Sequence, residues 1–161
     1  MVQVQVSALA IDAGTHSPIM LLKEEKGEKV LPIWIGFPEA SAIALARSYE
    51  KNEIERPLTH DLLKMILDAL NARLIKVVID ELSGTTYKAK LYLQSGNGDC
   101  YLDSRPSDAI ALALRTGAPI YIENSVFGKA GTADEGAAPD IDELRKRLRE
   151  IDPSDFGKFH F

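Results

Sequence analysis

The chain has 161 residues, 45% of them hydrophobic and 27% charged, with a formal net charge of −5. That length suits a single domain that needs neither a disulfide nor a metal ion to fold. Its apolar runs are far shorter than the roughly 20 residues of a membrane span, and 19 basic residues against 24 acidic ones argue mildly against a constitutive nucleic-acid coat protein.

Two features concern the cellular compartment. The N-terminal residues alternate between apolar and polar, without the basic and apolar regions of a signal peptide. The single cysteine, Cys100, can form neither an intramolecular disulfide nor a thiolate metal site, and we expect it to be a small buried hydrophobe. A reducing cytoplasm, away from any membrane, is therefore the expected location.

The first part of the chain predicts three strands and a helix. Strands are expected over residues 2–10, 18–23 and 30–36, the first from strict alternation of valine with polar residues. The third strand carries Trp34, which we expect in the core or in an interface. Pro38 and Glu39 suit the first turn of a helix that runs towards Lys51.

A second helix is expected after the break at Arg56-Pro57. Thr59 is a good N-cap residue, and Asp61 places a carboxylate in the first turn. Apolar residues then recur at helical spacing, at Leu62, Leu63, Ile66, Leu67 and Leu70. This spacing predicts that the stripe is buried.

The pattern of strands followed by a helix then appears again. Strands are expected over residues 74–82, 87–94, 100–103 and 119–123, and a helix begins at Pro106 with Asp108 in its first turn. Residues 42–46 and 109–113 have matching alanine-rich sequences, and the two helices end in Arg47 and Arg115. We therefore expect an α+β fold in which two related β-rich, hairpin-plus-helix repeats form mixed or antiparallel sheets with packed helices. Coincidence between two alanine-rich helices is the alternative.

The C-terminal region differs in composition. Residues 1–126 are predicted to form the main domain, and residues 127–139, rich in Gly, Ala and acidic residues, a flexible loop. Residues 140–161 are expected to form a helix over 141–151 and an aromatic tail that packs on the domain or on a neighbouring subunit.

Three motifs stand out at compatible spacing. They are Leu31-Pro32-Ile33-Trp34-Ile35-Gly36 with Glu39-Ala40, Arg56-Pro57-Leu58-Thr59-His60-Asp61-Leu62-Leu63, and Asp103-Ser104-Arg105-Pro106-Ser107-Asp108-Ala109-Ile110-Ala111-Leu112-Ala113. Together they resemble the bifunctional nuclease (BFN) family, from about residue 2 to residue 126. The resemblance implies two related β-rich halves, self-association and cleavage of DNA and RNA. An alanine-rich helix face and the aromatic tail favour a homodimer or higher homo-oligomer.

A nuclease has to hold a phosphodiester, stabilise developing negative charge and activate water. The candidate catalytic residues are Glu39, His60, Asp61, Asp103 and Asp108. Glu39, Asp103 and Asp108 are also the candidate ligands of Mg²⁺ or Mn²⁺, because such ions take carboxylate oxygens. Arg105 and Arg56 are the candidate phosphate ligands, and His60 is a candidate general acid or base.

Structural explanations exist for the same residues. Glu39, Asp61 and Asp108 all lie where a carboxylate stabilises a helix N-terminus. Asp103 and Arg105 suit a structural ion pair, and His60 suits an exposed first-turn position. Two rival functions remain open: a non-catalytic oligomeric binding or regulatory module, and a small-ligand enzyme with a deep apolar pocket.

Overall fold

The computed structural model describes residues 1–48, 56–130 and 148–150. Its strands are β1 (Val2–Asp12), β2 (Pro18–Glu24), β3 (Val30–Trp34), β4 (Arg73–Ser83), β5 (Thr86–Ser95), β6 (Gly98–Ser104), β7 (Ile120–Ile122) and β8 (Leu148–Glu150). Its helices are α1 (Phe37–Arg47), α2 (Thr59–Ala69), α3 (Pro106–Thr116) and α4 (Asn124–Ala130).

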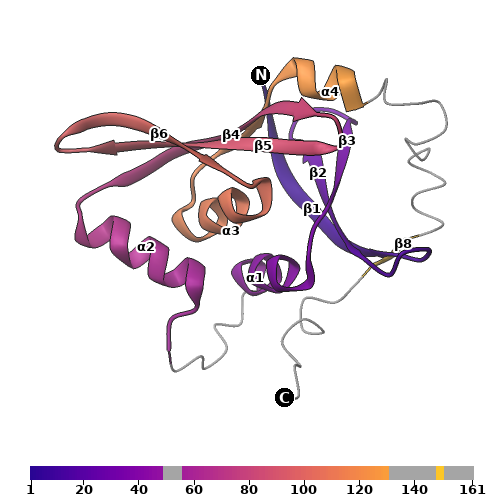
Figure 1. The fold of residues 1–161 in the computed structure, drawn as a ribbon, viewed down its shortest axis with the longest axis horizontal. Coiled ribbons are helices and arrows are strands. Elements are labelled where there is room, and N and C mark those ends of the chain that lie inside the picture. Colours follow the sequence, from indigo (N-terminus) through magenta and orange to yellow (C-terminus); the bar gives the residue numbers. More distant parts are fainter. Residues whose placement is uncertain (49–55, 131–147, 151–161) are drawn as a thin grey trace.

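The strands form one mixed sheet in the order β3-β2-β1-β7-β4-β5-β6, and β8 pairs with β1 (Figure 1). The pair β4–β7 is parallel, and the other neighbouring pairs are antiparallel. The short strand β7 thus joins two three-stranded units into one continuous sheet. The predicted α+β class with a mixed sheet is confirmed, whereas a common origin of the two units stays a prediction.

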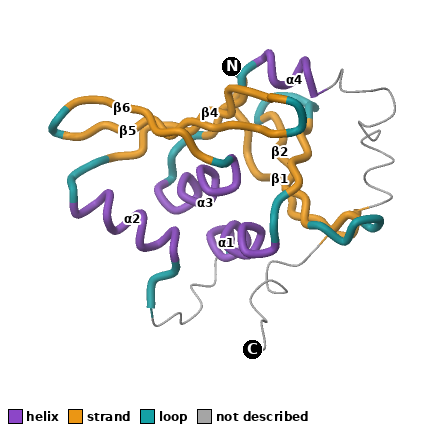
Figure 2. Tube along the Cα trace, viewed as in Figure 1, coloured by secondary structure: helices purple, strands orange, loops and turns teal. Residues whose placement is uncertain are grey.

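Short connections join β3 to α1 and β6 to α3 (Figure 2). These two helices pack against each other and against the sheet. Their contact faces are rich in alanine, with Ala40, Ala44, Ala109 and Ala113 at most 1% exposed. Small side chains let helix axes approach closely. The first turns of α1 and α3 are consequently held close together.

Helix α2 corrects one prediction, because its apolar stripe is not buried. Leu62, Leu63, Met65, Ile66 and Leu70 are between 41% and 69% exposed. Only Leu67 of the stripe packs on the core. The helix also begins one residue earlier than predicted, with Leu58 in place of Thr59 as the N-cap residue. Helical spacing identifies an apolar face, but it does not say whether this chain provides the surface that covers it.

The C-terminal predictions need two corrections. Residues 127–130 belong to α4 instead of a flexible loop, because the buried Val126 anchors this helix against the core. The predicted helix over 141–151 lies mostly outside the described residues, but residues 148–150 form strand β8 and pair with residues 10–12 of β1. β7 pairs only with residues 2–4 on β1, so β8 satisfies backbone groups that β7 leaves unpaired. The aromatic tail lies outside the described residues.

Cys100, predicted to be buried, and Trp34, predicted to lie in the core or in an interface, both lie at the surface of the single chain. Trp34, the last residue of β3, is 45% exposed. Cys100 on β6 is exposed as well. The hairpin β5–β6 extends past α3 (Figure 1), which leaves much of β6 uncovered. No helix in the described ranges has the length and apolar character needed to cross a membrane.

Candidate active site

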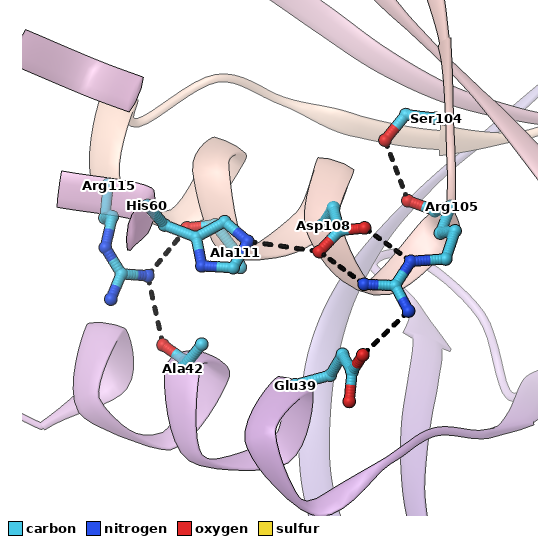
Figure 3. Close-up of polar contacts among 8 residues, drawn as sticks. All are labelled: Glu39, Ala42, His60, Ser104, Arg105, Asp108, Ala111 and Arg115. Carbon is cyan, nitrogen blue, oxygen red and sulfur yellow. Dashed lines mark hydrogen bonds and ion pairs between the residues drawn. The ribbon is translucent and has the colours of Figure 1, made fainter. Parts of the chain in front are cut away.

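The first turns of three helices meet at one place (Figure 3). Glu39 is the third residue of α1, His60 the second of α2, and Asp108 the third of α3. Arg105, the N-cap residue of α3, lies among them. We call Glu39, His60, Arg105 and Asp108 the Arg105 cluster. Helix N-termini carry partial positive charge and outward-pointing N–H groups, so a meeting point of three first turns is suited to anions.

Arg105 holds two carboxylates from different helices. Its Nε donates to Asp108 Oδ2 at 2.6 Å, and its Nη2 donates to Asp108 Oδ1 at 3.1 Å. Its Nη1 donates to Glu39 Oε1 at 2.7 Å. A guanidinium has five N–H donors, so these bonds use three of them, and the side chain is 65% exposed. Arg105 therefore retains donors that a phosphate can reach.

The position of Glu39 depends on Gly36, the N-cap residue of α1. A Cβ atom at Gly36 would lie 2.3 Å from Glu39 Oε2. The carboxylate thus occupies the space that any other residue would fill with its side chain. The glycine allows Glu39 to lie back over the start of its own helix and to reach Arg105 on α3.

The protonation states follow from these contacts. Burial by itself raises the pKa of Asp108, but hydrogen bonding and charge from Arg105, with a smaller contribution from His60, outweigh it and lower the pKa below 3.8. Hydrogen bonds to Asp108 and then to Glu39 raise the pKa of Arg105. Near neutral pH the cluster therefore contains an ionised Asp108 and a charged Arg105.

His60 is buried, contrary to the exposed position that its place beside the helix start suggests. Its Nε2 lies 3.3 Å from Asp108 Oδ1. In the tautomer whose Nε2–H donates to Asp108, Nδ1 carries a lone pair that can accept a proton. A carboxylate that orients an imidazole in this way is a suitable arrangement for general base catalysis.

The cluster opens into a cavity of about 330 Å³, which Glu39, His60, Arg105 and Asp108 line together with Leu58 and other residues. Two carboxylates and one guanidinium leave the cluster with a formal charge of −1 when His60 is neutral. The cavity therefore has a phosphate-binding donor set but not a strong positive field. An anionic substrate has to compete with Glu39 and Asp108 for Arg105.

Asp61 belongs to a different set of contacts. Its Oδ2 accepts the backbone N–H of Leu58 at 3.0 Å, and its Oδ1 accepts Arg115 Nε at 2.5 Å. Burial raises the pKa of Asp61, and the hydrogen bond and charge of Arg115, the Leu58 N–H and the neighbouring His60 lower it by more, so that it falls below 3.8. One oxygen of Asp61 thus caps the start of its own helix, and the other links α2 to α3.

The remaining predicted site residues lie apart from the cluster. Asp103 is exposed on β6, opposite Lys90 of β5, and Arg56 is exposed in the segment before α2. Within the described ranges, neither forms a hydrogen bond or ion pair with Glu39, Arg105 or Asp108. The predicted ion pair between Asp103 and Arg105 is not formed. The same part of the chain contains no group of three His, Cys, Asp or Glu side chains that could hold a metal ion.

Comparison with known proteins identifies the family. The family model for the bifunctional nuclease domain matches residues 20–135, which include every member of the Arg105 cluster. The chain belongs to the bifunctional nuclease domain family. The family resemblance of the sequence motifs is thereby confirmed.

Relatives of this family occur in bacteria and plants. An uncharacterized protein of Mycobacterium tuberculosis is 36% identical over 96% of this chain and 97% of its own length. Bifunctional nuclease 1 of Oryza sativa subsp. indica is 30% identical over 71% of this chain and 35% of its own length. Bifunctional nuclease 2 of Arabidopsis thaliana is 31% identical over 66% and 33%, respectively. The chain thus spans about a third of each plant nuclease.

Arg115 is the residue of this bifunctional nuclease domain that sequence reasoning missed. Its side chain is 8% exposed, and it donates to the Ala42 and Ala111 carbonyls at 3.0 and 2.9 Å (Figure 3) as well as to Asp61. It therefore links α1, α2 and α3. The sequence did contain a signal for Arg115. It follows a run of small and apolar residues of α3 that are buried, and a charged side chain next to such a run requires a partner.

Proposed function

We propose that this protein hydrolyses phosphodiester bonds of DNA and RNA at the Arg105 cluster. The observation that carries the proposal is the contact of His60 with Asp108 and of Asp108 with Arg105 at a shared cavity. This set supplies a proton acceptor, a residue that orients it and a phosphate ligand. Membership of the bifunctional nuclease domain family supports the same activity. The expected cytoplasmic location stays part of the proposal.

The proposed reaction assigns one task to each side chain. The remaining N–H groups of Arg105 bind the non-bridging phosphate oxygens, and they stabilise the negative charge that develops there. His60 Nδ1 takes a proton from water while the water oxygen forms a bond to phosphorus. The bond from phosphorus to the leaving sugar oxygen breaks, and that oxygen takes a proton from solvent. Asp108 keeps the imidazole in the required orientation and stabilises its protonated form.

We also propose Mg²⁺ or Mn²⁺ as a cofactor, because the two negative charges of Glu39 and Asp108 outnumber the single positive charge of Arg105 in the cluster. The arrangement of the described residues does not fit a metal site formed by Glu39, Asp103 and Asp108. Glu39 and Asp108 are both hydrogen-bonded to Arg105, and Asp103 makes no contact with them. No step of the proposed reaction is therefore assigned to a metal ion. Titration with each cation after treatment with a chelator tests the dependence.

The proposed function predicts a large effect of His60→Gln. Glutamine can still hydrogen-bond to Asp108 but cannot take up a proton, so kcat on a single-stranded oligonucleotide is expected to fall about 100-fold or more. The matched control is His16→Gln, because His16 is exposed in the turn after β1. Its activity is expected to equal that of the unmodified protein. Equal hydrolysis by both variants would mean that the reaction occurs at another site or in a contaminant.

The second candidate function is a non-catalytic oligomeric binding or regulatory module. It is favoured by the structural role of the acids, since Asp61 and Asp108 each have an arginine partner. The exposed apolar face of α2 also favours self-association. The inward side of α2 instead carries His60 and Leu67, so the helix directs its apolar face away from its own domain.

We propose a second copy of this chain as the partner of that α2 face. The exposed residues of this face carry no charge, and Lys64 and Asp68 on the rest of the helix pair with each other at 2.6 Å, so two α2 faces can meet without repulsion between like charges. A two-fold arrangement would cover the same residues on both copies. The proposal concerns a homodimer, and nuclease activity and binding are equally compatible with it.

Self-association through α2 predicts that Leu62→Glu with Ile66→Glu converts a dimer into a monomer. Burial of a charge without a partner is costly, and both side chains are already exposed in the single chain, so folding is expected to persist. Light scattering after size-exclusion chromatography measures the mass. Phe37→Glu is the control, because Phe37 is a similarly exposed apolar residue on α1. A monomeric unmodified protein at every concentration would contradict the proposal.

A further inference from the structure

Trp34 is an exposed tryptophan whose orientation is fixed. The indole Nε1–H donates to Asp12 Oδ2 at 3.1 Å, and the side chain is 45% exposed at the end of β3. Asp12 is itself held by the backbone N–H of Gly14. That bond and then the bond from Trp34 lower the pKa of Asp12, so the carboxylate stays ionised as an acceptor. The ring is therefore held in place while part of its surface remains open to a ligand.

The exposed ring lies at a second cavity, next to the Arg105 cluster. This cavity has a volume of about 450 Å³ and is lined by Trp34 and Tyr87 among others. Glu39 and Arg105 line both this cavity and the first one, so their ion pair separates the two. A molecule that binds Arg105 can thus extend into either cavity. A volume of this size suits a small organic ligand.

We propose that the second cavity binds one unpaired nucleobase, stacked on Trp34, while the adjoining phosphate binds Arg105. The inference rests on the proposed function, because it uses the same phosphate ligand. Base–aromatic stacking tolerates any base, since every base has a π-face. A base inside a duplex is stacked on its neighbours and cannot enter a pocket of this kind without being turned out of the helix. The ligand class is therefore single-stranded nucleic acid.

The polar lining of the cavity supports broad recognition instead of selection for one base. Ser17, Thr85, Thr86 and Ser107 supply hydroxyl groups, and each hydroxyl can donate or accept a hydrogen bond. The charged groups of the lining, Glu39 and Arg105, lie on the side that this cavity shares with the first. A lining of hydroxyls and aromatic rings accepts purines and pyrimidines and makes no demand on the sugar. This is what an enzyme for both DNA and RNA requires.

The experiment uses the fact that Trp34 is the only tryptophan of the chain. Tryptophan emission is recorded while the full-length protein is titrated with a single-stranded phosphorothioate oligothymidylate, which resists hydrolysis. Parallel titrations use an abasic oligonucleotide of equal length and a fully paired duplex. We expect saturable quenching with oligothymidylate, and binding about 10-fold weaker or more for the abasic strand, as loss of one stack implies.

Two variants separate stacking from folding. Fluorescence anisotropy of a labelled oligothymidylate is expected to show about 10-fold weaker binding for Trp34→Ala and much less loss for Trp34→Phe, which keeps an aromatic face. Equal affinity for the abasic strand, or equal affinity of Trp34→Ala and the unmodified protein, would overturn the base site. Saturable quenching without hydrolysis of ordinary oligonucleotides would instead overturn only the nuclease. Absence of binding to any strand would overturn both.

Discussion

Arg105→Ala is expected to lower kcat/KM for hydrolysis of a single-stranded oligonucleotide about 100-fold or more, because it removes the donors aimed at the phosphate. The same change leaves Glu39 and Asp108 without their shared cation. Their negative charge then repels the substrate. The effect is expected in both kcat and KM, since the guanidinium acts on the bound phosphate and on the developing charge.

Two further variants sharpen this prediction. Arg105→Lys keeps the charge but loses the planar fork that contacts Asp108 and Glu39 together, so it is expected to recover only part of the activity. Arg73→Ala removes one exposed positive charge from β4, outside the cluster, and is the control for net charge. Steady-state kinetics on all three proteins provide the comparison. Equal losses in Arg105→Ala and Arg73→Ala would show that only net charge matters.

Arg115→Met is expected to lower the free energy of unfolding by about 2 kcal/mol, because two carbonyls lose a donor while the partner carboxylate of Asp61, 38% exposed, can still be hydrated. Arg115 is 8% exposed and holds Asp61, Ala42 and Ala111. Methionine fills much of the volume but leaves two carbonyls without this donor. Urea unfolding monitored by circular dichroism measures the change.

At acidic pH the difference in the free energy of unfolding between the unmodified protein and Arg115→Met should become smaller. The pKa of Asp61 is lowered in the folded chain, so the ion pair contributes its full stability above 3.8, and this contribution is lost as the pH falls through the folded pKa. The matched control is Lys64→Ala, which breaks an exposed pair of the same helix. Its effect is expected to be about 0.5 kcal/mol or less. A loss as small for Arg115→Met would contradict its role as a link between three helices.

The strands and the helix starts were predictable because their causes are local. Alternation of apolar and polar residues produced β1 and β5, and Pro38 and Pro106 mark the first turns of α1 and α3. The predictions that were wrong concern what packs around an element in the folded chain. The spacing of α2 indicates an apolar face, yet the chain itself does not cover that face. The alternation around Trp34 indicates a strand, but not that its last residue lies beside an open cavity.

For the candidate site, too, the identity of the residues was predictable, whereas their contacts were not. The family resemblance together with residue chemistry selected Glu39, His60, Arg105 and Asp108 as candidates, but it also selected Arg56, Asp61 and Asp103, which do not join the cluster. The partners of the cluster residues were decided by packing, because the alanine faces of α1 and α3 bring two first turns within reach of one guanidinium. Contacts between residues 48 or 66 positions apart depend on how helices pack, and no local pattern encodes that distance. Local sequence determined which groups this protein has, and the tertiary structure decided which of them meet.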